Sequence, residues 1–248
     1  MTRLEDNGVT AGDARKAALP MFIWLGLPLL VAIAPGATRA IGENAYQAWF
    51  RTEGGAVELA TALFLFVAVC AGLLLIRRGQ TFPRPWLRPW FVLFTLGCIY
   101  FLGEEISWGQ HIFGWSTPEA LAESNDQGET NLHNLGGWVG TLLDQAPRLA
   151  LTLAALVGGL IGPLYLRQRR LSWNPERDAA PWIWPTIVAL PAAVGALTIS
   201  LPRKLMDTSD IPWLDIQTGE SKEAFLALFL MLYAVTVLRT CPRAKQAD

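Results

Sequence analysis

Two groups of polar side chains in this sequence have the residue types that acid/base or metal chemistry requires. The first is the run GEEISWGQH, which places Glu104 and Glu105 directly after an apolar segment. The second is GETNLHN, where Glu129 and His133 are four positions apart and would share one face of a helix. Carboxylates combined with an imidazole suit Zn, Mn or Fe better than Ca. We therefore expect catalytic roles for Glu104, Glu105 and His133, and a divalent metal at Glu105, Glu129 and His133.

Other polar residues are expected to bind the substrate beside these groups. Glu58 and Glu223 begin the similar runs ELATALFLF and EAFLALFLM, which place an acid at the same depth on two helices and are weak evidence of an internal repeat. The same two acids would also be stabilised by the helix dipole, without any function. A lone ExxxH pair, likewise, is often only a polar turn. The remaining expected binding residues are Ser107, Trp108, Gln110 and Asn131.

The elements that carry these residues are expected to be membrane-spanning helices. The chain has 248 residues, of which 52% are hydrophobic and only 17% charged, whereas a soluble domain normally has about 25% charged residues. A helix needs about 20 apolar residues to cross the hydrocarbon core. We expect an all-α membrane protein with six such spans, at 18–36, 56–76, 87–103, 149–166, 182–201 and 223–239.

The distribution of charge predicts the orientation of these spans. Lys and Arg concentrate at both termini and in the connections after the second and fourth spans, while Asp and Glu concentrate on the opposite side. Basic residues favour the cytoplasm, so the tails 1–17 and 240–248 should be cytoplasmic. The connection 104–148 should then be an extracytoplasmic polar loop of the single transmembrane domain 18–239. The first span could instead be a signal peptide, although Pro35 disfavours cleavage after Ala34.

Glycine and proline positions predict how two of the spans pack. Gly158 and Gly162 form a GxxxG pattern, which allows close approach of another helix. Pro185 and Pro191 predict a kink in the fifth span. The three cysteines have no CxxC spacing, and the net charge of -1 gives no reason to expect nucleic-acid binding.

GEEISWGQHIFGW followed by GETNLHNL resembles a motif in a group of uncharacterised bacterial multi-pass membrane proteins. The resemblance covers mainly 55–65 and 103–137, and it implies a bacterial inner-membrane protein without implying a reaction. In the related sequences an arginine often stands at the position of His111, which implies that His111 is not an obligatory metal ligand.

Three functions remain open from the sequence. The first is a metal-assisted enzyme that acts on a lipid or lipid-linked substrate at the outer membrane face. The second is a cation- or proton-coupled transporter or channel, in which the same acids bind the ion. The third is a non-catalytic partner of another envelope protein. Membrane lipids are the expected surroundings in all three, and nothing in the sequence predicts an oligomeric state.

Overall fold

The computed structural model describes residues 19–52, 54–123, 130–131, 137–169, 175–201 and 218–240. All regular elements within these ranges are helices. The long ones are α2 (Leu27–Ile41), α4 (Ala56–Arg77), α5 (Leu87–Glu105), α8 (Gly137–Ala154) and α13 (Thr218–Thr240). Shorter helices complete or connect them: η1 (Phe22–Gly26), α3 (Glu43–Phe50), η2 (Gly79–Thr81), η3 (Ser107–Gly109), α6 (Gln110–Phe113), α7 (Glu119–Ala122), η4 (Ala155–Ile161), α9 (Gly162–Arg169), α10 (Ala180–Ile183), η5 (Ile187–Ala189) and α11 (Leu190–Thr198).

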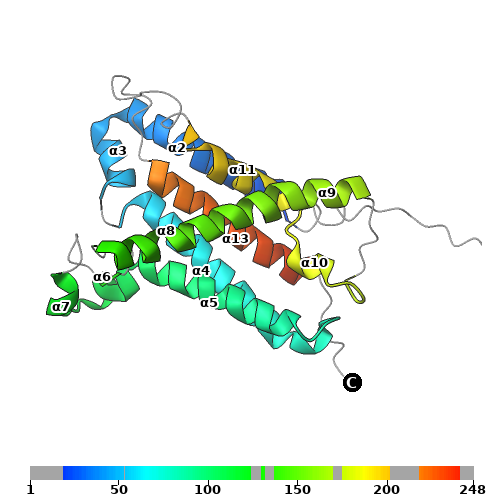
Figure 1. Cartoon of the computed structure of the whole chain (residues 1–248). Helices are drawn as coiled ribbons and strands as arrows, with labels where there is room; N and C mark the ends of the chain where they lie inside the picture. The colour runs from blue at the N-terminus through cyan, green and yellow to red at the C-terminus, as the bar shows by residue number, and fades with distance from the viewer. Residues whose placement is uncertain are drawn as a thin grey trace, which may run out of the picture.

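The long helices form one bundle in which α13 occupies the centre. Buried residues make up 78% of an 18-residue window of α13, against 22% to 50% in the other apolar helices of this length. Figure 1 shows α4 and α5 along one side of α13, α2 and α11 along another, and α8 crossing in front. Leu226, Leu228 and Leu232 of α13 are fully buried in the main apolar core. The central helix therefore contributes to the core on several of its faces.

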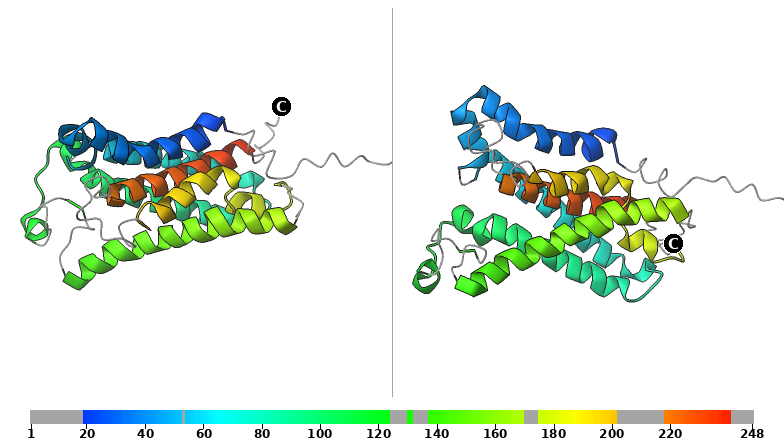
Figure 2. Two further views of the ribbon diagram at one scale, coloured as in Figure 1. Left: turned by 90° about the horizontal axis from the view of Figure 1, so that it is seen from above. Right: turned by 45° about the horizontal axis from the view of Figure 1, so that its top comes forward.

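Successive long helices run in alternating directions through this bundle. Figure 2 shows that η1 begins and α13 ends at the same end of the molecule. The short helices α3, α6 and α7 gather at the opposite end (Figure 1). Glu58, Glu105 and Glu223 consequently lie near that opposite end, on α4, α5 and α13.

Five of the described segments are long and apolar enough to cross a membrane. These are Phe22–Ile41, Ala56–Arg77, Gly140–Tyr165, Ala180–Thr198 and Thr218–Thr240. They correspond to five of the six expected spans, and the prediction of an all-helical fold is confirmed for the described residues. The expected span 87–103 forms α5, which is not among these five segments and carries Arg88 near its start and Glu104 and Glu105 at its end.

The fourth and fifth expected spans differ most from the structure, in their boundaries or their shape. The helix that contains 149–166 begins earlier, at Gly137. Its first turns are helical but include polar residues, so they were not recognised as part of an apolar span. The fifth span is broken as Pro185 and Pro191 predict: α10 ends at Ile183, and a 3-10 turn precedes α11. A Cβ atom at Gly158 would lie 3.3 Å from Pro185, and one at Gly162 would lie 2.6 Å from Trp184. The two glycines therefore allow close packing against this break.

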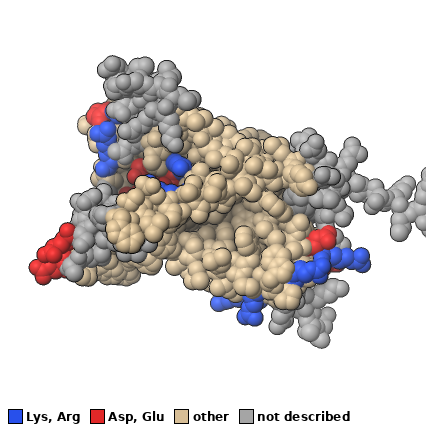
Figure 3. Space-filling view, in the orientation of Figure 1, with Lys and Arg blue, Asp and Glu red and all other residues tan. Residues whose placement is uncertain are grey.

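Charged side chains are confined to the two ends of the face shown in Figure 3. Acidic and basic residues lie near α3 and the start of α13 at one end, and near α10 and the start of α5 at the other. Between them the visible surface consists of other residue types. Leu93 and Leu96 of α5 and Leu149 and Leu153 of α8 are among the exposed apolar residues of these helices. A surface of this kind suits contact with lipid chains.

Candidate functional site

The chain reverses abruptly after α5, within the run GEEISWGQH. Ser107 and Trp108 have φ angles of 45° and 53°, and Gly109 follows with φ 88°. Left-handed backbone is unfavourable for residues other than glycine, by roughly 1–2 kcal/mol each. The left-handed backbone of Ser107 and Trp108 must therefore be stabilised by contacts of the surrounding residues.

Glu104 and Trp108 form the principal contact of this turn. The indole Nε1 of Trp108 donates a hydrogen bond of 2.7 Å to Oε1 of Glu104, which is only 6% exposed. The indole ring lies directly over Gly103, where a Cβ atom would come within 2.8 Å of it. Tyr100 packs edge-on against the same ring, with centroids 6.3 Å apart. Glu104 therefore serves as the acceptor that fixes Trp108 over the end of α5.

The other expected binding residues of the run connect it to residues 130–131. Ser107 Oγ accepts a bond of 3.4 Å from Asn131 Nδ2, and both residues are buried. Gln110 Oε1 accepts bonds from the backbone N–H of Thr130 at 2.7 Å and from the hydroxyl of Thr117 at 3.1 Å. These contacts give Ser107, Gln110 and Asn131 a structural role at the end of the bundle.

Glu105 lies beyond the expected span 87–103 and faces a group of charges from three other helices. Burial raises the pKa of the Glu105 carboxyl well above its ordinary value. The negative charges of Glu223, Glu220 and Glu58 raise this pKa further, in that order, and the positive charge of Arg148 lowers it. The structure thus brings together Glu58 of α4, Glu105 of α5, Glu220 and Glu223 of α13, and Arg148 of α8.

Individual contacts position the members of this charged cluster, which we define as Glu58, Glu105, Arg148, Glu220 and Glu223. Arg148 Nη2 lies 3.0 Å from Glu223 Oε1, with 46% of the arginine side chain and 14% of the glutamate side chain exposed. Glu58 Oε2 accepts a bond of 2.9 Å from the backbone N–H of Gly54, as expected for an acid near a helix start. Glu58 therefore stabilises the start of α4 in addition to contributing charge to the cluster.

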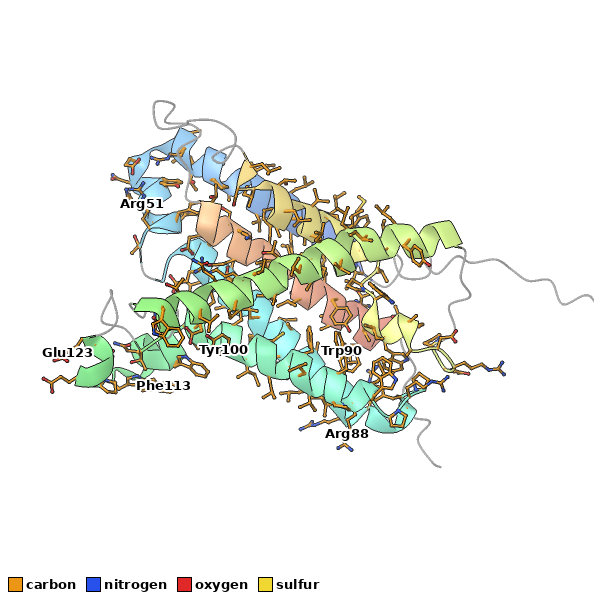
Figure 4. The ribbon with its side chains drawn as sticks, in the orientation of Figure 1. Arg51, Arg88, Trp90, Tyr100, Phe113 and Glu123 are labelled. Atoms are coloured by element: carbon orange, nitrogen blue, oxygen red, sulfur yellow. The ribbon has the colours of Figure 1, made fainter. Side chains whose placement is uncertain are left out.

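A cavity of about 590 Å³ extends from the charged cluster into the bundle. Residues of α5, of α8 and η4, and of α13 line it. Glu104, Glu105, Arg148 and Glu223 line one end, and the walls beyond them are almost entirely apolar, with Leu93, Phe101, Leu151, Val157 and Phe229 among the lining residues. Figure 4 shows Trp90 and Tyr100 along the stretch of α5 that borders this cavity.

Aromatic residues close the end of the cavity that lies away from the charged cluster. Trp90 Nε1 donates a bond of 3.0 Å to the hydroxyl of Tyr233, which in turn donates a bond of 2.7 Å to the carbonyl of Trp182. Trp90, Tyr233, Ile183 and Trp184 line the cavity there. Trp90 and Glu105 are 15 positions apart on α5, which corresponds to about 22 Å at 1.5 Å per residue.

The expected metal site falls partly outside the described residues. Glu129 and His133 are not among them, so the arrangement of Glu105, Glu129 and His133 and the choice of Zn, Mn or Fe stay predictions. Within the described ranges, no group of three or more His, Cys, Asp or Glu residues is arranged to hold a metal ion. His133 also keeps its catalytic role only as a prediction.

Two members of the charged cluster were not expected from the sequence to belong to a site. Glu220 precedes the expected span 223–239, and in the structure it lies in the first turn of α13. The sequence feature that could have predicted its position is the i, i+3 spacing from Glu223, which places both acids on one face of a helix. Arg148 had a weaker signal, as a lone basic residue in the acid-rich connection 104–148.

No protein-family model, no curated protein and no solved structure matches this chain.

Proposed function

We propose that this protein is a multi-pass membrane protein that takes a lipid or lipid-linked molecule from the bilayer into the cavity between α5 and α8. The observation that carries the proposal is the asymmetry of the cavity, which is apolar along its walls and charged at one end only. Its volume of about 590 Å³ lies in the range of pockets that bind small molecules. An acyl or isoprenoid chain would match the walls, and its head group would lie at the charged cluster.

The length of the cavity also suits a lipid tail. Its extent of about 22 Å along α5 exceeds one leaflet of a hydrocarbon core that is about 30 Å thick. Leu93 of α5 and Leu151 of α8 line opposite sides of the cavity, and exposed apolar side chains continue outside it. A tail could therefore enter laterally between these two helices without crossing polar surface.

The proposal places the protein in a bacterial inner membrane, with α5 as a sixth crossing and both termini in the cytoplasm. The alternating helix directions in Figures 1 and 2 support six crossings, and the excess of Lys and Arg on one side supports the orientation. The charged cluster would then lie at the outer face. There it would meet the head group of an outer-leaflet lipid.

Chemistry on the bound head group is the catalytic extension of the proposal. Because its pKa is raised, Glu105 retains its proton to higher pH than an ordinary glutamate, which is the property required of a general acid. Metal assistance by Glu129 and His133 would be added to this role. Binding of the lipid is the step that the cavity supports directly, and it is tested first.

The test fills the cavity without disturbing the fold. Gly97 lines the cavity, and a Cβ atom there would have no neighbour within 4 Å, so Gly97→Phe should place its ring in the open space. Gly36 of α2 likewise has no neighbour within 4 Å and does not line the cavity, so Gly36→Phe is the matched control. Native mass spectrometry of the purified proteins measures the fraction that carries one lipid.

We expect one lipid to remain bound to the unmodified protein and to Gly36→Phe. Gly97→Phe should retain it at least roughly tenfold less, a change equivalent to about 1.4 kcal/mol. Equal lipid retention by Gly97→Phe and Gly36→Phe, with both proteins folded by circular dichroism, would show that the cavity does not bind the lipid.

A further inference from the structure

We infer that the cavity selects a phospholipid whose head group carries a primary amine, with the ammonium held by the charged cluster. This inference rests on the proposed function, because it names the class of lipid that the same cavity would take. Three features of the cavity support it: its walls are apolar, the charges at one end are mostly negative, and the acids at that end belong to different helices.

The apolar walls contribute little to selectivity. A lipid tail that moves from the bilayer into the cavity exchanges one apolar environment for another, so no hydrophobic driving force favours the transfer. Leu93, Leu151 and Phe229 would accept a tail of any phospholipid class equally well. The head-group end must therefore decide which lipid stays bound.

The charges at that end are predominantly negative. The groups that act on Glu105 are the three acids Glu58, Glu220 and Glu223 and one base, Arg148. Arg148 is already in contact with Glu223 at 3.0 Å. An anionic head group would add a like charge to this set, whereas an ammonium would reduce the repulsion among the acids.

The acids come from different directions, as an ammonium with several N–H donors requires. Glu105 of α5 and Glu223 of α13 line the cavity from two helices. Glu58 of α4 lies near the same end of the bundle and adds negative charge, without being among the lining residues. A primary ammonium can donate three hydrogen bonds, and bonds to charged groups contribute about 1.5–3 kcal/mol each. A trimethylated ammonium keeps the charge but loses all three donors. Arg148 also lines this end of the cavity, and its positive charge could pair with the phosphate that joins the amine to the glycerol.

The experiment compares lipids that differ only in their head groups. The unmodified protein is placed in nanodiscs that contain phosphatidylethanolamine, phosphatidylcholine and phosphatidylglycerol with identical acyl chains, and the bound lipid is identified by native mass spectrometry. We expect phosphatidylethanolamine to be enriched roughly tenfold over phosphatidylglycerol, equivalent to about 1.4 kcal/mol. Phosphatidylcholine should fall between them.

Two variants assign the selectivity to the acids. The double change Glu105→Gln with Glu220→Gln removes two acidic groups from the cluster, and it should reduce the preference for phosphatidylethanolamine over phosphatidylglycerol to about threefold or less, a loss of roughly 0.7 kcal/mol. Glu119→Gln, at an exposed acid in α7 outside the cluster, should leave the preference unchanged. Glycerophosphoethanolamine, which has the head group without the tails, should not displace the bound lipid at equal concentration.

The outcomes separate this inference from the proposed function. Binding of all three lipids to equal extents, abolished by Gly97→Phe, would overturn the amine selectivity and leave lipid binding in the cavity intact. Lipid binding that Gly97→Phe does not reduce would overturn both. Displacement by glycerophosphoethanolamine would show that the ligand is a soluble amine and not a lipid.

Discussion

Glu104 and Glu105 are adjacent in the chain but have different surroundings. Neighbouring positions on a helix point about 100° apart. Glu104 is directed toward Trp108 and accepts its indole hydrogen bond, while Glu105 is directed toward the acids of α4 and α13. From the sequence, both were expected to have catalytic roles. In the structure both residues line the cavity. Glu104 is hydrogen-bonded to Trp108, whereas Glu105 lies among other acids that raise its pKa.

Glu105 should make the stability of the protein depend on pH in a defined direction. Below the ordinary glutamate pKa of 4.5, the carboxyl holds its proton in both the folded and the unfolded state. Above that pH the unfolded state releases the proton and the folded state retains it, so the free energy of unfolding falls as pH rises. Glu105→Gln removes this loss. The variant should therefore melt at a higher temperature than the unmodified protein at pH 7, by roughly 2–4 °C for each kcal/mol gained.

Thermal unfolding in detergent, followed at pH 4 and pH 7, measures the effect. The difference between the two proteins should shrink toward pH 4. Glu119→Gln, at an exposed acid, is the control and should show no such dependence. A Glu105→Gln protein that melts below the unmodified protein at pH 7 would contradict the direction of the pKa shift.

At the scale of elements, the turn after α5 is held by its packing on the last turn of that helix. The left-handed Ser107 and Trp108 direct the indole back over Gly103, and residues 130–131 bond to the same turn. Strained backbone of this kind persists only where the surroundings fix it. These contacts also fix the last residues of α5, and thereby the position of Glu105 in the charged cluster.

Gly103→Ala should destabilise the protein, although alanine is the better helix former by about 1 kcal/mol. The new Cβ atom would lie 2.8 Å from the ring of Trp108 and displace it, at a cost of roughly 1–3 kcal/mol. Gly97→Ala in the same helix meets no atom within 4 Å and should stabilise by up to about 1 kcal/mol. Chemical denaturation of both variants measures the two signs. An equal gain in stability from both substitutions would show that Trp108 does not need the space over Gly103.

The elements themselves were largely predictable, and the turn was not. Apolar length predicted Ala56–Arg77 almost to the residue, and Pro185 predicted the break before α11. The shared ExxxALFL pattern placed Glu58 and Glu223 at one depth, and both act on Glu105. By contrast, no local signal marks Ser107 and Trp108 as left-handed, because a positive φ outside glycine depends on tertiary contacts. Arg148 was missed for a related reason, since its role arises from the crossing of α8 over α13.

At the scale of the whole molecule, the cavity results from the way α8 crosses the bundle. α8 and η4 lie across α11 and α13 and diverge from α5 (Figure 1). Residues of α5, α8, η4 and α13 line the cavity. Which helices become neighbours could not be read from the sequence, because α4, α5 and α13 are apolar on all sides and show no single core-facing stripe. The proposed position of the charged cluster at the outer face depends on α5 crossing the membrane.

Cysteine labelling tests this crossing and its direction. In a protein with Cys70, Cys98 and Cys241 replaced by serine, single cysteines are introduced as Arg84→Cys before α5 and Glu119→Cys after it, both at exposed positions. If α5 crosses, these positions lie on opposite sides of the membrane. Because Lys and Arg concentrate on the side of Arg84, the cysteine at 119 should react with a membrane-impermeant maleimide added to intact cells whose outer membrane has been permeabilised.

The cysteine at 84 should react only after the inner membrane is also opened. A contrast of roughly tenfold or more between the two positions in intact cells is expected, because a charged reagent does not cross the hydrocarbon core. Equal labelling at 84 and 119 would mean that α5 enters and leaves the same face, which would leave five crossings and place the charged cluster elsewhere. The reverse contrast would keep six crossings but move the charged cluster to the cytoplasmic face, where the lipid would be drawn from the inner leaflet.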